Sequence, residues 1–162
     1  MTDFEKRLAR AIERGHRASD ERARAEAAKA LSEKELRGLH SQYRLELSEH
    51  IEQCLRRLPN HFPGFTFEPV VTDRGWGAAV SRDDVNLRSR GRRDNLFSRM
   101  ELLIRPISDY FVLDLAAKAT VRNKEIFARN HYQKLGEVDL ESFTELIDLW
   151  VLEFAERYAS AG

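Results

Sequence analysis

Cysteine is nearly absent from this sequence, because Cys54 is the only one among 162 residues. A single thiol excludes any disulfide within the chain, so the fold must rest on a hydrophobic core, and a reducing compartment is consistent with this. No apolar run approaches the roughly 18 residues of a membrane-spanning helix, and the charged N-terminal residues lack the apolar core of a signal peptide. We therefore expect a soluble, cytoplasmic protein.

Sequence motifs that name a reaction are also missing. The chain has no glycine-rich phosphate-binding loop, no nucleophile elbow and no Cys-x-x-Cys pair of zinc ligands. The sequence therefore predicts neither an enzyme nor a bound cofactor.

Net charge is zero, but the charges are unevenly spread. Residues 1–58, 59–137 and 138–162 carry formal charges of +2, +3 and −5. A chain that coats nucleic acid is basic overall. The pattern instead indicates that parts of opposite charge neutralise one another within one molecule or between protomers.

Residues 99–122 carry the clearest strand pattern. Apolar side chains alternate with mostly polar ones over two runs, and the short polar stretch 107–110 separates them. A period of two predicts half-buried strands, and the short connection predicts that they pair antiparallel. The face that must be covered carries Phe111, Leu113 and Leu115.

Two further segments resemble strands, and one resembles a loop. Residues 65–80 predict a hairpin, in which Pro69 places its strand at a sheet edge or a bulge. Residues 126–134 fit a fifth strand after a turn at 122–125, although a short helix remains an alternative. The segment 82–97 shows no periodicity and is expected to be a loop, of a length that is usually functional or mobile.

Helices are expected on both sides of these strands. Thr2 and Glu5 form a capping-box pattern before a first helix that starts at Asp3, and residues 19–31 are helical by propensity but have little to bury. A second capping box at Ser32 precedes a strong apolar stripe that runs to Leu58, where Pro59 should stop the helix. A last amphipathic helix follows Asp139 as its N-cap and runs over 140–158.

Together these segments predict an α+β fold. We expect an antiparallel β-meander of about five strands, covered on one face by two amphipathic helices. Residues 32–162 should form this single compact domain. Residues 1–31 should form a polar helical arm that is a coiled coil, a solvated helix or partly disordered.

One pair of side chains, His50 and Cys54, could bind a metal ion. His50 and Cys54 lie four residues apart on a predicted helix, so both could face one ion, with His40 or His61 as a third ligand. Cys54 also fits the apolar stripe as a small core residue, and a structural zinc site needs four ligands. We therefore predict no metal site.

Three other features favour structural roles. His131 sits among polar neighbours of a strand, where a surface or hydrogen-bonded histidine is more common than a general base. The pair Asp83 and Asp84, beside Arg82, is typical of a solvated loop rather than of acid–base catalysis. Trp76 stands between two glycines, where a core tryptophan or a bulge is more common than a stacking platform.

A cluster of arginines is the one feature of the sequence that suggests how the protein could bind a partner. The candidate partner-binding or nucleic-acid-binding residues are Arg82, Arg88, Arg90, Arg92 and Arg93. Arginine grips phosphate with two hydrogen bonds and releases counterions from nucleic acid. Asp83, Asp84 and Asp94 reduce the local charge, so docking on an acidic protein surface and having no binding role both remain open.

These observations lead to a functional expectation. The leading hypothesis is a non-enzymatic interaction or scaffold protein that is homo-oligomeric through its N-terminal helices. The alternative is a nucleic-acid-associated protein that uses the arginine cluster.

Overall fold

The computed structural model describes residues 2–87 and 93–161. The elements in order are α1 (Asp3–Leu55), α2 (Leu58–His61), β1 (Thr66–Thr72), β2 (Gly75–Leu87), β3 (Arg93–Ile104), β4 (Val112–Val121), β5 (Lys124–Lys134), the 3-10 turn η1 (Leu135–Glu137) and α3 (Leu140–Ser160). The chain divides into two units, Met1–Gly38 and Leu39–Gly162. No helix in the described ranges is both long enough and apolar enough to cross a membrane.

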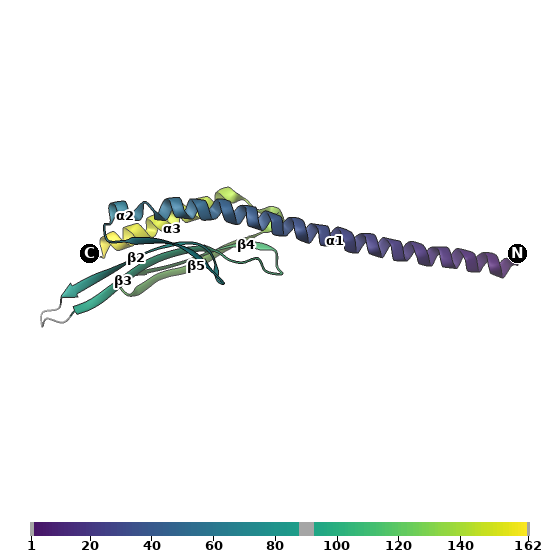
Figure 1. Cartoon of the computed structure of the whole chain (residues 1–162), viewed down its shortest axis with the longest axis horizontal. Helices are drawn as coiled ribbons and strands as arrows, with labels where there is room; N and C mark the ends of the chain where they lie inside the picture. The colour runs from purple at the N-terminus through teal and green to yellow at the C-terminus, as the bar shows by residue number, and fades with distance from the viewer. Residues whose placement is uncertain (1, 88–92, 162) are drawn as a thin grey trace. The chain divides into compact units, whose positions relative to one another are not determined.

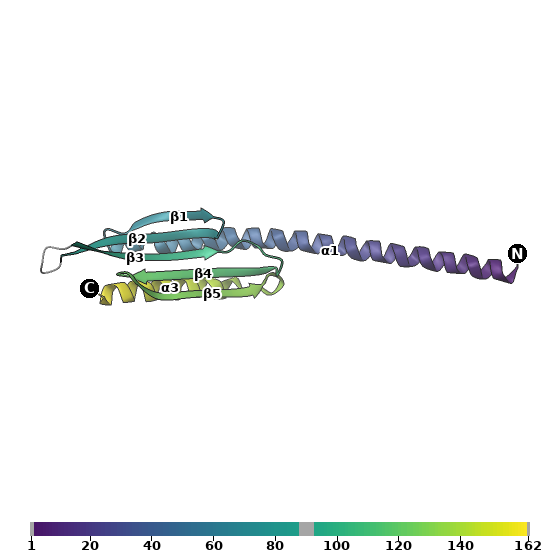
Figure 2. The ribbon, with the colours of Figure 1, turned by 90° about the horizontal axis from the view of Figure 1, so that it is seen from below.

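The sheet of the second unit is an antiparallel meander. Its strands lie in the order β1-β2-β3-β4-β5, so each strand pairs with its neighbour in sequence. Residues 126–134 lie within β5, which settles the choice between strand and helix for that segment. β1 is an edge strand (Figure 2), as Pro69 predicted. The α+β class and the five-strand meander are therefore confirmed.

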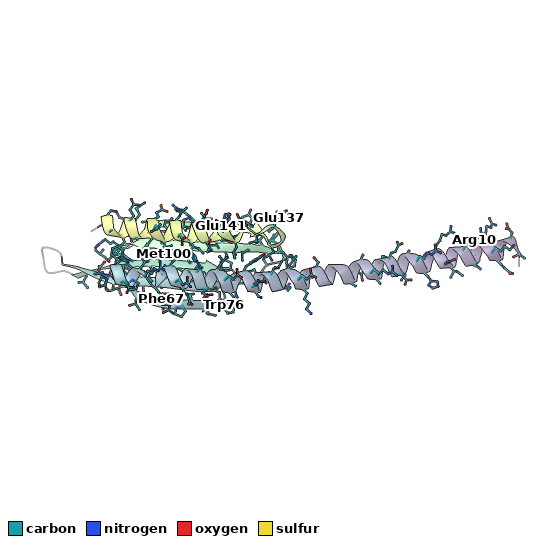
Figure 3. The ribbon with its side chains drawn as sticks, turned by 90° about the horizontal axis from the view of Figure 1, so that it is seen from above. Arg10, Phe67, Trp76, Met100, Glu137 and Glu141 are labelled. Atoms are coloured by element: carbon teal, nitrogen blue, oxygen red, sulfur yellow. The ribbon has the colours of Figure 1, made fainter. Side chains whose placement is uncertain are left out.

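One face of the sheet carries the core. Helix α3 and the part of α1 that belongs to the second unit lie along this face (Figure 1), and Figure 3 shows them side by side with Met100 labelled between them. The side chains that are almost fully buried include Leu47, Ile51, Leu55, Met100, Leu102, Ile104, Leu113, Leu115, Phe143, Ile147 and Phe154. The alternation of β3 and β4 meets the apolar stripes of two helices, which is the expected two-layer packing.

Helix α1 is one continuous helix, and the expected new start at Ser32 is wrong. It begins at Asp3 as predicted, where the Thr2 hydroxyl accepts a hydrogen bond from the Glu5 amide at 3.2 Å. The capping box at Ser32 does not interrupt it because no proline intervenes and the alanine, arginine and glutamate residues favour helix. Gly15 and Gly38 each cost about 1 kcal/mol relative to alanine, which is too little to break the helix.

The predicted helix end at Leu58 is also wrong. Helix α1 ends at Leu55, and α2 then begins at Leu58 with Pro59 in its first turn. Proline is well tolerated in a first turn because the amide that it lacks has no intrahelical acceptor there. Pro59 therefore starts a short helix instead of stopping a long one.

The expected loop over 82–97 is wrong as well. Residues 82–87 of β2 pair with residues 93–98 of β3, so most of that segment is strand. Asp83, Val85, Asn95 and Phe97 are exposed, whereas the more buried Arg82, Asp84 and Ser98 are polar. No alternation of apolar with polar residues therefore marks this end of the hairpin, and backbone pairing shows that it is strand.

The turn between β4 and β5 is present but shorter than the predicted 122–125, because Lys124 and Glu125 already belong to β5. Arg122 and Asn123 have φ values of 48° and 69°, which a two-residue hairpin turn of type I′ requires at both positions. The Asn123 side chain accepts a hydrogen bond from the Phe97 amide and donates one to the Asn95 carbonyl, each at 2.8 Å. The Asn123 side chain therefore links the turn to the backbone of the adjoining part of β3.

Candidate functional site

Arg82 is engaged within the molecule. Its Nε lies 2.7 Å from Oδ1 of Asp84, and its guanidinium also donates to the Pro63 carbonyl. A guanidinium that already holds a carboxylate and a carbonyl has fewer donors left for a phosphate. The structure thus gives Arg82 a structural role within the second unit.

Of the other candidate arginines, the structure describes only the backbone of Arg93. Arg88, Arg90 and Arg92 lie outside the described residues. Arg93 is the first residue of β3 and pairs with Leu87 through the backbone. The proposed binding role of these four arginines remains a prediction.

Asp84 is the centre of a packed polar cluster. Besides Arg82 it accepts a hydrogen bond from the Tyr158 hydroxyl at 2.7 Å, and Arg122 approaches it at 3.9 Å. Its side chain is only 15% exposed. The expectation that Asp83 and Asp84 both lie in a solvated loop is therefore wrong, because Asp84 ties the sheet to α3.

Burial and the neighbouring Asp84 both change the pKa of Tyr158. Burial raises the pKa of the Tyr158 phenol, and the hydrogen bond to Asp84 raises it further. A phenol with a raised pKa stays protonated and donates to the carboxylate. This contact has the properties of a structural tie rather than of an acid–base site.

Trp76 is not the core tryptophan that the sequence favoured. Its side chain is 41% exposed, and the Arg44 guanidinium lies over its ring at 3.7 Å from the centroid. This is a cation–π contact between β2 and α1 (Figure 3 labels Trp76). Gly77 beside it has no room for a side chain, since a Cβ there would lie 1.9 Å from the Leu102 carbonyl oxygen.

His131 lies on β5 against α3. Its ring meets Phe143 edge-on at 4.9 Å, and its Nε2 is 3.2 Å from the Gln133 amide nitrogen. Both contacts are accounted for by packing. The expectation of a hydrogen-bonded histidine with a structural role agrees with this geometry.

The structure does bring three potential ligands together at His50. Its Nε2 lies 2.8 Å from Oδ1 of Asp148 and 3.6 Å from Sγ of Cys54, and the Cys54 thiol donates to the same Asp148 oxygen at 3.3 Å. His50 and Cys54 are one turn apart on α1, whereas Asp148 comes from α3. We call these three residues the His50 cluster.

The third member of the cluster was not found from the sequence. His40 and His61, the possible third ligands in the sequence, do not belong to the group of donor atoms that lie within 4.8 Å of one another. Asp148 is separated from Cys54 by 94 residues. Its only sequence signal is a carboxylate on the polar side of an amphipathic helix, which many surface residues share.

A cavity of about 560 Å³ borders the His50 cluster. Its polar lining comes from Cys54, Arg57, His61 and Asp148. Its apolar lining includes Leu58 of α2, Phe62 directly after α2, and Val151 and Leu152 of α3. Small-molecule sites often combine apolar walls with a few convergent polar groups. The arrangement could hold a ligand next to the three donor atoms.

The geometry of the cluster does not fit a catalytic cysteine. In a Cys–His–Asp relay the carboxylate holds one ring nitrogen while the other nitrogen takes the thiol proton, but here Asp148 and Cys54 both approach Nε2 of His50. Burial and the Asp148 carboxylate also raise the pKa of Cys54 to about 11. A thiol that stays protonated at neutral pH is a poor nucleophile.

The first unit differs from the second in the exposure of its side chains. Every side chain from residue 2 to residue 27 is exposed, including Phe4, Leu8 and Ile12, which follow one another at spacings of four (Figure 3 labels Arg10 in this segment). Positions four apart lie on one face of a helix. The segment therefore presents an apolar stripe that nothing in its own unit covers.

Comparisons with known proteins add no identity. No protein-family model matches the chain, and no curated protein or solved structure matches it significantly.

Proposed function

We propose that this protein is a non-enzymatic scaffold that forms homo-oligomers through residues 3–38 of α1. The observation that supports this is the exposure of every side chain from 2 to 27, with Phe4, Leu8 and Ile12 exposed by 65%, 47% and 53%. In soluble proteins a helix of this kind usually buries its apolar stripe against another element. The occupant that we propose is the same segment of a second copy.

Helix energetics support an association of this kind. Intrahelical ion pairs such as Arg7–Asp3 and Arg17–Glu13 are exposed, and such pairs contribute only about 0.2–0.5 kcal/mol each. Most of the stability of helices in proteins comes from packing of an apolar face. Pairing with another helix would supply that packing to residues 3–27.

Charge is compatible with self-association. Residues 3–38 carry ten basic and eight acidic side chains, which alternate along the helix without a block of one sign. Two copies would therefore bring both signs together without strong repulsion. A partner of strongly acidic or strongly basic character would find less complementarity here.

Light scattering after size-exclusion chromatography tests the proposal. We expect the full chain to run as a dimer or larger species, and the triple variant Phe4→Ala, Leu8→Ala, Ile12→Ala to shift toward monomer at the same concentration. The matched control is Lys6→Ala, Arg10→Ala, Arg14→Ala, which changes residues on the opposite face of the same helix turns.

The two variants separate a specific interface from a general effect on the helix. Both introduce three alanines, so both favour helix to a similar degree. Equal loss of the oligomer in both variants, or a monomeric wild-type chain, would contradict pairing through the Phe4 stripe.

A nucleic-acid role is the second candidate, and it rests on the four arginines within residues 88–93. If each contacts a phosphate, replacing Arg88, Arg90, Arg92 and Arg93 by Gln should reduce the log–log salt dependence of duplex or RNA binding by roughly 3–4. If the cluster instead docks on the acidic Glu141–Glu156 face of a neighbouring copy, the same variant should change the oligomer mass. Absence of both effects would leave the cluster without a binding role.

A further inference from the structure

We propose that His50, Cys54 and Asp148 bind one Zn²⁺ ion, with a water molecule in the fourth coordination position beside the adjoining cavity. The three side chains supply one nitrogen, one sulfur and one oxygen from two helices. Three protein ligands and one exchangeable ligand are a common arrangement for zinc.

The distances between donor atoms agree with a shared ion. Bond lengths of about 2.3 Å to sulfur and about 2.0–2.2 Å to nitrogen and oxygen place tetrahedral ligands about 3.4–3.6 Å apart. The observed separations are 3.6 Å for Cys54 and His50, 3.3 Å for Cys54 and Asp148, and 2.8 Å for His50 and Asp148. On binding, the His50–Asp148 pair would have to open by about 0.6 Å and the Cys54–Asp148 pair by about 0.3 Å, while the Cys54–His50 pair already has the required separation.

The pattern of contacts also points to a common centre. Each of the three donor atoms lies close to both of the others, so they form a triangle rather than a chain. A proton relay needs a chain that passes through both ring nitrogens of the histidine. A triangle of donors is what a single ion above its centre requires.

The donor set selects the class of metal. A thiolate is a soft ligand that Mg²⁺ and Ca²⁺ do not favour, and imidazole with thiolate suits zinc and related ions. On binding, the Cys54 thiol loses its proton to solvent, and His50 must offer the lone pair of Nε2 and carry its proton on Nδ1. The two anionic ligands then balance the charge of the ion.

The position of the site gives the ion a structural consequence. His50 and Cys54 lie on α1 in the second unit, and Asp148 lies on α3. These are the helices that cover the sheet side by side (Figure 3). A shared zinc ion would cross-link them, and the neighbouring cavity would leave the fourth position open to water.

Metal titration of the full chain tests the proposal. After removal of metal with a chelator, we expect calorimetric titration with Zn²⁺ to give one ion per chain and a rise in the melting temperature. Titration with Co²⁺ should produce a sulfur-to-cobalt charge-transfer absorption band. Because Cys54 is the only cysteine, this band reports on that residue alone.

Three variants examine the ligands one by one. Cys54→Ser should abolish the charge-transfer band, and His50→Gln and Asp148→Asn should each weaken Zn²⁺ binding by more than about 10-fold, the least that loss of even an outer-shell partner usually costs. His61→Gln is the matched control, since it removes a histidine that lines the same cavity. It should bind Zn²⁺ as the wild type does.

Several results would overturn the proposal. These are a cobalt complex without the sulfur band, one ion per two chains, and Zn²⁺ affinity that is unchanged in His50→Gln or Asp148→Asn. Loss of affinity in His61→Gln would overturn the open fourth position. Circular dichroism of each metal-free variant shows whether it folds, and a variant that does not fold is replaced by Asp148→Ser or His50→Ala for the same comparison.

Discussion

The polar residues of the second unit that are buried as a whole each have a specific partner, whereas Nε of the partly exposed Arg122 is buried without a hydrogen bond. Among the described residues, those buried as a whole are His40, Ser98 and Glu101. His40 donates from Nε2 to the Arg105 carbonyl at 3.1 Å, Ser98 accepts from the Arg122 amide, and Glu101 pairs with Arg99 and Arg74. Because a buried polar group without a partner costs about 1–3 kcal/mol, these contacts keep the polar side chains compatible with the core.

His40 should make the stability of the protein depend on pH. Burial lowers the pKa of His40 below its ordinary value of 6.5, and the nearby Arg44 charge also lowers it, although the hydrogen bond to Arg105 acts in the opposite direction. The unfolded chain therefore binds a proton at higher pH than the folded chain does. We expect the free energy of unfolding to be undiminished above pH 6.5 and to fall as the pH drops from 6.5 toward the lowered pKa.

Urea unfolding at several pH values checks this expectation. His40→Gln cannot titrate but can still donate to the Arg105 carbonyl, so its stability should depend less on pH over the same range than that of the wild type. His16→Gln, on the exposed first unit, is the control and should keep the wild-type dependence. A His40→Gln curve parallel to the wild type would show that this histidine does not titrate on unfolding.

Helix α3 shows how one element joins several parts of the core. Phe143, Ile147, Trp150, Val151, Phe154 and Tyr158 form its buried side. Phe154 and Tyr158 also belong to an aromatic cluster with Phe62 and Phe65, whose ring centroids are 4.8–6.4 Å apart. The helix therefore contacts both the sheet and the segment that follows α1.

Truncating the stripe of α3 should destabilise the second unit as a whole. Trp150 is 8% exposed, so Trp150→Ala should lower the free energy of unfolding by about 3–5 kcal/mol through lost burial and an unfilled cavity. Leu149→Ala is the control one residue away. Leu149 is 59% exposed, and its loss should cost less than about 0.5 kcal/mol.

Denaturant unfolding followed by circular dichroism measures both variants. Helix and sheet signals should be lost in one transition, because α3 and the sheet share one core. Equal stability of Trp150→Ala and Leu149→Ala would mean that the stripe of α3 is not part of that core.

At the scale of the molecule, the two units differ in what stabilises them. The hydrophobic core that the structure describes begins at Leu47 and continues to Tyr158. The side chains of residues 2–27 are all exposed. Folding of the second unit should therefore not depend on the first.

Removing residues 1–31 tests this independence. We expect the remaining chain, 32–162, to keep its melting transition within a few degrees of the full chain, because no described core side chain is lost. The oligomer should be lost at the same time if residues 3–38 form the interface. A strongly lowered melting temperature together with a retained oligomer would contradict both expectations.

The local sequence determined which segments are strands and helices wherever one face is buried. Met100, Leu102 and Ile104 alternate because every second residue of β3 enters the core, and the stripe of α3 repeats every three to four residues for the same reason. The sequence also determined the antiparallel order, since its short connections do not permit crossovers. At residues 82–87 the more buried positions hold the polar side chains Arg82 and Asp84, whereas the apolar Val85 is exposed, so the pattern disappeared and the prediction of a loop failed.

The tertiary structure alone decided which distant side chains meet. Asp148 contacts His50 and Cys54, which lie 98 and 94 residues before it in the sequence. Tyr158 contacts Asp84, which lies 74 residues before it. Periodicity reports only whether a residue faces the core, because it depends on neighbours within the same element. Contacts between elements depend on how α1, α3 and the sheet pack against one another, and that packing is set by many apolar side chains together.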